Sequence, residues 1–115
     1  MTAVAEAREA LEATLTSVPG LRVYMDPGAT VQPPAVVVSL PDLRWEAMCV
    51  DPTGATFSIA VIAKLNDRAI EVLQELVLQV AEALDSVPEA VVRTARTGTW
   101  NDQLPAYLIE TEVSL

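Results

Sequence analysis

The stretch Ala55-Thr-Phe-Ser-Ile-Ala-Val-Ile-Ala-Lys-Leu65 decides the fold, because it is the clearest strand of the chain. Side chains alternate between the two faces of a strand, and here the odd positions are all apolar. The face that they form consists of Phe57, Ile59, Val61, Ala63 and Leu65. The turn signal Asp51-Pro52-Thr53-Gly54 precedes this strand, and residues 43–50 alternate loosely. The two segments together predict a β-hairpin.

A helix is predicted directly after this strand, over residues 67–84, with Asn66-Asp67 as its cap. The apolar stripe of the helix recurs at helical spacing and consists of Ile70, Leu73, Val77, Val80 and Leu84. Leu78 and Val72 lie outside that stripe. Such additional apolar surface suggests that the helix contacts a second subunit.

The N-terminal part predicts one helix and two strands. Val4, Ala7, Leu11, Leu15 and Val18 recur on one face of a helix over residues 3–17, which Pro19-Gly20 ends. A short strand over 21–25 leads into the proline-rich stretch 26–34, which cannot join the middle of a sheet because proline donates no ladder hydrogen bond. Residues 35–40 (Ala-Val-Val-Val-Ser-Leu) predict a central strand, covered on both faces.

The C-terminal part predicts two further strands, over 90–97 and 106–115, joined by a long connection over 98–105. The element order is therefore α-β-β-β-β-α-β-β. One-sided helices and a mostly antiparallel sheet predict the α+β class, as a two-layer sandwich with both helices packed on one face. The length of 115 residues fits a single domain over 1–115.

Composition argues against catalysis. The chain has no histidine, the commonest general base, and no phosphate-binding loop or cysteine pair for zinc. Cys49 is the single cysteine and is expected to be a buried strand thiol. Glu110 and Glu112 are interpreted as solubilising residues on the solvent-exposed face of an edge strand. We expect no enzyme activity, no cofactor and no metal.

The charge and hydropathy pattern limits the partners. The formal net charge is −9 with seven basic residues, whereas tight nucleic-acid binding needs many lysines and arginines. The arginines look scattered along the sequence. Neither a membrane-spanning run nor a secretory signal is expected, so the protein should remain in the cytoplasm where it is made.

Several residues are candidates for contacts with other proteins, because tryptophan and arginine are enriched at binding hot spots. The first group is Trp100, Asn101 and Asp102 in the last connection, and the second is the arm of Val31, Gln32, Pro33 and Pro34. Arg44, Trp45 and Leu78 complete the set. Two simpler interpretations stay open: Trp100 folds back over the sheet edge, and the arm is a passive surface loop.

Taken together, these segments give the chain a familiar pattern. Its features are the opening helix over 3–18, the strand Ala35-Val-Val-Val-Ser-Leu40 after a proline-rich loop, the strand over 57–65 that runs into the helix over 67–84, and the end Pro105-Ala-Tyr-Leu-Ile-Glu-Thr-Glu-Val-Ser-Leu115. In this arrangement the chain resembles the tail terminator proteins of long-tailed, siphovirus-type bacteriophages. The likeness is one of architecture and includes no diagnostic motif.

The resemblance implies a virion structural protein in the neck region of the tail, made in the host cytoplasm. Such proteins form a hexameric ring that caps the tail tube, stops its polymerisation and meets the head connector, and they have no catalytic residues. DNA would pass through the ring without specific binding. We expect some of Glu110, Glu112, Asp51 and Asp102 to face that lumen, where like charge discourages sticking.

Two alternatives remain. A head-closure or head–tail joining subunit of the neck would share the fold and the absence of catalytic groups. A small regulatory module of ferredoxin-like type would instead bind a ligand in a defined pocket.

Overall fold

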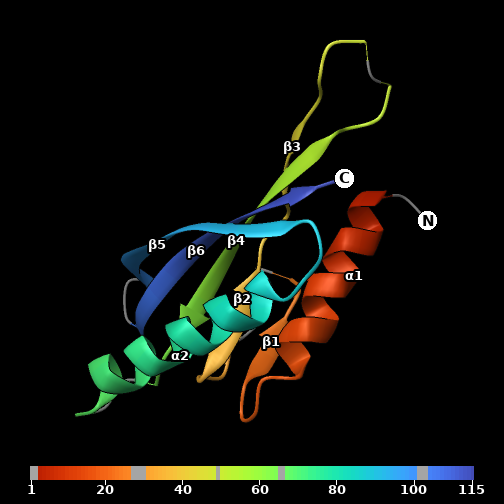
Figure 1. The fold of residues 1–115 in the computed structure, drawn as a ribbon. Coiled ribbons are helices and arrows are strands. Elements are labelled where there is room, and N and C mark those ends of the chain that lie inside the picture. The colour runs from red at the N-terminus through yellow and green to blue at the C-terminus, as the bar shows by residue number, and fades with distance from the viewer. Residues whose placement is uncertain (1–2, 27–30, 49, 65–66, 101–103) are drawn as a thin grey trace.

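The elements follow one another in the predicted order, α-β-β-β-β-α-β-β (Figure 1). The structure is a computed structural model that describes residues 3–26, 31–48, 50–64, 67–100 and 104–115. Its helices are α1 (Ala3–Thr16) and α2 (Ala69–Asp85). Its strands are β1 (Arg22–Tyr24), β2 (Ala35–Val38), β3 (Asp42–Arg44), β4 (Gly54–Ile62), β5 (Ala90–Trp100) and β6 (Leu104–Ser114). The chain therefore belongs to the α+β class.

Strand β4 is the centre of the sheet, as its alternating pattern predicted. One of its edges pairs antiparallel with β6 over nine residue pairs, and its other edge pairs first with β3 and then with β2. The path through the sheet is β1-β2-β4-β6-β5, in which only β1 and β2 run parallel. Strand β6 thus lies inside the sheet between β4 and β5, and the prediction that Glu110 and Glu112 sit on an edge strand is wrong.

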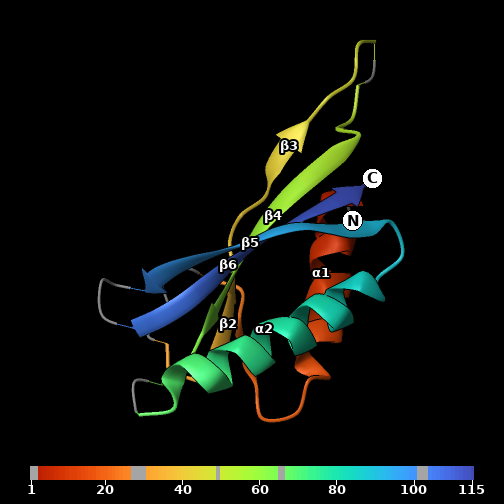
Figure 2. The same cartoon turned by 60° about the vertical axis from the view of Figure 1, so that its left-hand side comes forward.

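The main core lies between the sheet and the two helices, which pack on the same face (Figure 2). Phe57 of β4 is fully buried there, together with Leu11 and Leu15 of α1 and Val80 and Leu84 of α2. Helix α1 packs on α2 and β1, and α2 packs on β4, β5 and β6. The helical spacing of leucine and valine in both segments had predicted this two-layer arrangement.

A second, smaller core occupies one end of the opposite sheet face. Val37, Ala60, Ile62 and Ala106 are buried there, and Tyr24, Val31, Trp100 and Leu104 pack against them. Because both faces are covered at this end, β2 is buried at all four of its residues. The prediction of a central, covered strand after the proline-rich stretch is confirmed.

The predicted strand over residues 43–50 is mostly absent. Pairing with β4 covers only Asp42–Arg44, and the chain then leaves the body as a protrusion that returns at Gly54 (Figure 2). The cause is a lack of neighbours, since the protrusion extends past the helices and its apolar side chains have nothing to pack against. Cys49 lies outside the described residues.

Helix α2 differs from expectation at its start. Arg68 is the N-cap residue and makes no side-chain capping hydrogen bond, so the prediction of a cap at Asn66-Asp67 is wrong, with Asn66 itself outside the described residues. Ile70, predicted in the buried stripe, is 70% exposed, whereas Ala69 and Leu73 on either side of it are buried, so Ala69 takes the inward position in the first turn. Leu78 is equally exposed, which agrees with its position outside the stripe.

The last two strands are longer than predicted. Gly98–Trp100 extends β5, and Leu104-Pro105 begins β6, so most of the predicted connection over 98–105 is paired strand. Pro105, which has no backbone N–H, pairs with Thr99 near the start of β6. A bulge at Arg93, between Val92 and Thr94, shifts the pairing of β5 on β6.

Replacing Thr111 by valine should stabilise the protein. Thr111 is fully buried on the helix-covered face of β6, and its Oγ1 has no hydrogen-bond partner among the described residues. An unsatisfied buried hydroxyl costs free energy, whereas valine has nearly the same shape and no polar atom. We expect the free energy of unfolding to rise by about 1 kcal/mol. Urea unfolding measures this, and a loss of stability would mean that the hydroxyl has a partner in solution.

Candidate protein interaction site

The protrusion between β3 and β4 exposes apolar side chains to an unusual degree. Met48 is 103% and Val50 93% exposed, and Trp45 is 53% exposed. We call these three residues and the half-exposed Leu43 the hairpin surface. Soluble domains seldom leave so much apolar area in one place unless another molecule covers it. The hairpin surface is therefore the strongest candidate for a functional contact.

Backbone strain adds to the evidence at the tip. Met48 has a φ of 68°, in the left-handed region that favours glycine or asparagine. A long apolar side chain at such a position, fully exposed, gains nothing from the fold of its own chain. Strained non-glycine residues are often retained where they serve a function.

The base of the protrusion is held in place. The Thr53 backbone N–H donates to the Arg44 carbonyl at 2.8 Å, and the Leu115 N–H donates to the Thr53 carbonyl at 3.0 Å. Higher up, the indole N–H of Trp45 donates to the Val50 carbonyl at 3.3 Å. This last bond joins the indole to the returning segment of the protrusion.

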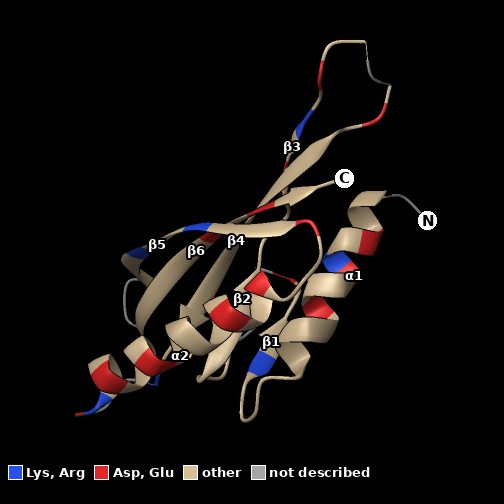
Figure 3. Cartoon of the chain, in the orientation of Figure 1, with Lys and Arg blue, Asp and Glu red and all other residues tan. Residues whose placement is uncertain are grey.

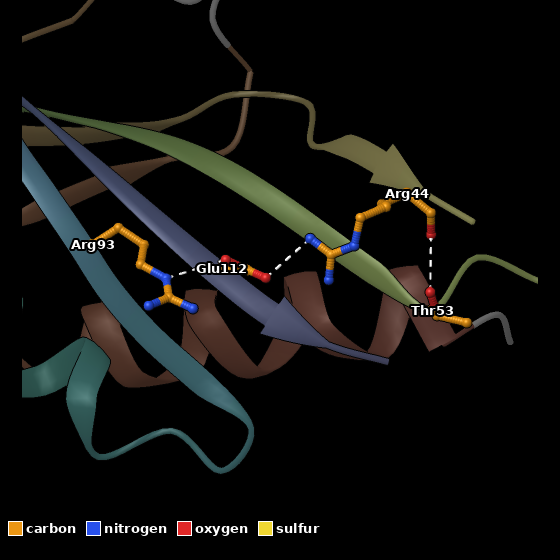
Figure 4. A network of polar contacts seen from close by, with 4 residues as sticks. All are labelled: Arg44, Thr53, Arg93 and Glu112. Atoms are coloured by element: carbon orange, nitrogen blue, oxygen red, sulfur yellow. Dashed lines mark hydrogen bonds and ion pairs between the residues drawn. The ribbon is translucent and has the colours of Figure 1, made fainter. Parts of the chain in front are cut away.

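Two arginines converge on one glutamate next to this base (Figure 4). Arg44 Nη1 of β3 donates to Glu112 Oε1 at 2.9 Å, and Arg93 Nε of β5 donates to Glu112 Oε2 at 3.1 Å. The contacts tie β3, β6 and β5 together across the sheet face that the helices leave open. The sequence impression that the arginines are scattered is wrong here, because cross-strand neighbours are set by register and not by distance along the chain.

Gly54 makes the first of these contacts feasible. Arg44 pairs with Gly54 across the strands, and its guanidinium crosses β4 at that point to reach β6. A Cβ atom at position 54 would collide with the guanidinium. A larger residue at position 54 would therefore force the flexible guanidinium of Arg44 to move from its path to Glu112.

The network should leave a signature in the pH dependence of stability. The hydrogen bond from Arg44, and next the one from Arg93, lowers the pKa of Glu112 below its ordinary value. A lowered folded pKa stabilises the fold above the ordinary glutamate pKa of about 4.3, and this contribution is lost as pH falls through the folded pKa. Melting temperatures of wild type and Glu112→Gln should therefore differ most near neutral pH and converge in acid. Gly54→Val should remove part of the same dependence, and a difference independent of pH would contradict the assignment.

The structure gives the predicted proline-rich arm a role within its own chain. Gln32 donates its backbone N–H to Tyr24 Oη at 3.3 Å, and its carbonyl accepts from Arg22 Nη1 at 3.2 Å. Val31 packs on the second core, and the Pro34 carbonyl accepts from the Arg22 N–H. The contacts of this arm are therefore those of a loop packed on β1. The arm consists of Val31, Gln32, Pro33 and Pro34.

Trp100 likewise packs on its own sheet. It is half-buried at the end of β5 and covers the second core, which corresponds to the simpler of its two interpretations. Asn101 and Asp102, predicted beside it as interface residues, lie outside the described residues. Trp45 is the tryptophan that remains available for a partner.

Of the four acidic residues predicted for a lumen, the structure describes Glu110, Glu112 and Asp51, and these three do not lie together. Glu110 and Glu112 share the open sheet face, but Glu112 is held between two arginines and adds little net negative charge there. Asp51 lies in the protrusion, and Asp102 is outside the described residues. Figure 3 shows that acidic residues also occur along both helices.

Sequence reasoning named Arg44, Trp45 and Leu78 but missed Met48 and Val50. The signal was present in Ala47-Met-Cys-Val50. These four apolar residues are consecutive, so they show neither the alternation of a half-buried strand nor the spacing of an amphipathic helix. An apolar run without periodicity, next to a strong turn, can indicate a protruding contact segment.

Neither a candidate metal site nor a membrane-spanning helix occurs in the part of the chain that the structure describes. Among residues 3–26, 31–48, 50–64, 67–100 and 104–115, no group of three or more Cys, Asp or Glu could hold a metal ion. Within the same ranges, neither helix is long and apolar enough to cross a bilayer. The chain matches no family model and no curated protein sequence.

Proposed function

We propose that this chain is a structural subunit of a long-tailed bacteriophage: a tail terminator that forms a ring on the tail tube, stops its polymerisation and joins the tail to the head connector. The observation that carries the proposal is the hairpin surface, in which Met48 and Val50 are almost fully exposed and Trp45 is half-exposed. A surface of this kind serves assembly.

Three further features support the proposal. The structure has the α+β element order on which the resemblance to tail terminators is based. The absence of histidine in the sequence removes the commonest general base from any catalytic scheme. The net charge of −9 suits a ring through which DNA passes without being held.

The test is the length of tail tubes. The gene should be deleted from the genome that encodes the chain, and the particles imaged by electron microscopy. If the chain is a terminator, the deletion strain should produce tubes of uncontrolled, increased length that lack heads. Supplying the intact chain should restore a single tube length. The triple variant Trp45→Ala, Met48→Gly, Val50→Asp should fail to restore it.

Other outcomes of this test identify the alternatives. Tubes of normal length beside filled but unjoined heads would replace the terminator by a head-closure or joining role. Normal particles would refute a structural role in the virion and would leave the regulatory-module alternative, which would then require a ligand-binding pocket.

A further inference from the structure

The outer side of α2 carries one exposed leucine among acidic residues. Leu78 is 70% exposed and lies outside the buried stripe. Residues three, four and seven positions apart lie on the same side of a helix. Around Leu78 these positions hold four exposed acidic residues, Glu71, Glu75, Glu82 and Asp85. With 3.6 residues per turn, Glu75 and Glu82 fall on one flank of Leu78, and the uncharged Gln74 and Ala81 fall on the other.

The open face of the sheet exposes a leucine of its own. Leu108 belongs to β6, which lies inside the sheet, and it is nevertheless 45% exposed. It alternates with the buried Ile109 of the helix-covered face. On the open face it lines a hollow of about 100 Å³ together with Ser58, Thr94, Arg96 and Glu110. Helices commonly cover sheet faces in layered domains, so a helix can pack on this part of the face.

The helices and the strands differ in charge. The two helices contain seven acidic residues and one arginine, a net charge of −6. The six strands contain four arginines and three acidic residues, a net charge of +1. Figure 3 shows this separation, with red along both helices and blue on β3 and β5. The molecule is therefore acidic on its helix side, although the sheet side is not.

Arg96 is the unpaired cation of the hollow. Arg44 and Arg93 are both bound to Glu112, whereas Arg96 has no ion pair with any residue that the structure describes. Glu110 lines the same hollow from the inner strand β6, and Arg96 lines it from the edge strand β5. Acidic side chains that approach from the β5 side would therefore meet Arg96 before Glu110.

We propose that the outer side of α2 in one copy packs on the open sheet face of the next copy. Leu78 enters the hollow beside Leu108. The acidic flank of α2, formed by Glu75 and Glu82, faces Arg96 on the β5 side, and the uncharged flank faces β6. This inference rests on the proposed function, because it names the subunit contact that a ring requires.

Charge selects this occupant over a symmetric one. Two helix layers placed face to face would bring like charges together, whereas a helix layer on the sheet face of another copy brings acidic residues to an arginine. The helices lie on one side of the sheet and the open face lies on the other (Figure 2), so the contact is head to tail. Head-to-tail contacts close into a ring if the rotation between copies allows it.

Two complementary variants test the direction of the contact. The helix-defective chain, Leu78→Glu, keeps an intact sheet face. The sheet-defective chain, Leu108→Glu with Arg96→Glu, keeps an intact α2. All three positions are exposed and glutamate is a good helix former, so folding should survive, and thermal unfolding checks this for each variant. Leu40→Glu changes an exposed leucine between β2 and β3, outside both surfaces, and controls for the added negative charge.

Sedimentation velocity of the purified chains at rising concentration reads out assembly. We expect wild type and the control to self-associate, and each defective variant alone to associate at least about 30-fold more weakly, as the loss of an interface hot spot does. An equimolar mixture of the two defective variants should form a species of two chains, twice the 12.3 kDa mass. It should stop there, because the mixture offers one intact helix side and one intact sheet face per pair.

A charge exchange tests the electrostatic part of the contact separately. Arg96→Glu alone should weaken association, because it places a negative charge opposite the acidic flank of α2. Adding Glu75→Arg and Glu82→Arg to the same chain restores opposite charges across the contact and should strengthen association again by about tenfold. A further loss of association in this chain would contradict the placement of α2 over Arg96.

Three results in sedimentation would overturn the proposal. Wild type could remain monomeric at all concentrations, the defective variants could associate like the control, or their mixture could stay monomeric while wild type assembles. The experiment contains no tail tubes, so its failure is distinct from that of the terminator. Association as expected, together with normal tube length in the deletion strain, would refute the terminator and keep the contact.

Discussion

Phe57→Ala should destabilise the protein more than the truncation of any other buried side chain, by about 3–5 kcal/mol. Phe57 is the largest fully buried side chain and lies at the centre of β4, between the sheet and the helices. Its removal loses the transfer free energy of an aromatic ring and leaves a cavity, because close-packed neighbours relax only in part. Domains of this size have about 5–15 kcal/mol of total stability, so the loss should be plain in urea unfolding.

The matched control for this change is Ser58→Ala, one residue further along the same strand. Ser58 points to the open sheet face and is exposed, so its truncation should alter the free energy of unfolding by less than about 0.5 kcal/mol. If the two variants lost similar amounts of stability, the assignment of the two faces of β4 would be incorrect.

Leu15→Ala should cost about 2–5 kcal/mol and should show that α1 belongs to the folded unit. Leu15 is fully buried near the end of α1 and belongs, with Leu11, to the main core. The helix is also tied to the body by Arg8, whose Nη2 donates to the Met25 carbonyl at 2.5 Å. Truncating Leu15 therefore opens a cavity between α1, α2 and β1.

Leu78→Ala is the matched control, because it makes the same change in the other helix at a position that is 70% exposed. In a helix alanine is at least as favourable as leucine, so the stability of the separate chain should change by less than about 0.5 kcal/mol. Unfolding is followed at low protein concentration, where association does not contribute. A small effect of Leu15→Ala, equal to the control, would mean that α1 packs only loosely.

Much of the fold followed from the sequence by itself. Period-two alternation in residues 55–65 and helical spacing in residues 3–18 and 67–84 predicted the central strand, both helices and the face that each buries. Such patterns are local, because each follows from the geometry of one element and from the tendency of apolar side chains to leave water. The element order and the α+β class needed nothing more, and composition alone argued against histidine-based chemistry.

Only the tertiary structure decided which surfaces remain free. Trp45 and Trp100 are equally apolar in the sequence, yet Trp100 lies on the second core and Trp45 extends past the helices. Glu112 looks like any surface glutamate until strand register brings Arg44 and Arg93 to its two oxygens. Ile70 fits a buried stripe, but in the first turn of α2 it is Ala69 that is buried and Ile70 that is exposed. Exposure and pairing depend on what the rest of the chain places nearby, and periodicity within one segment does not contain that information.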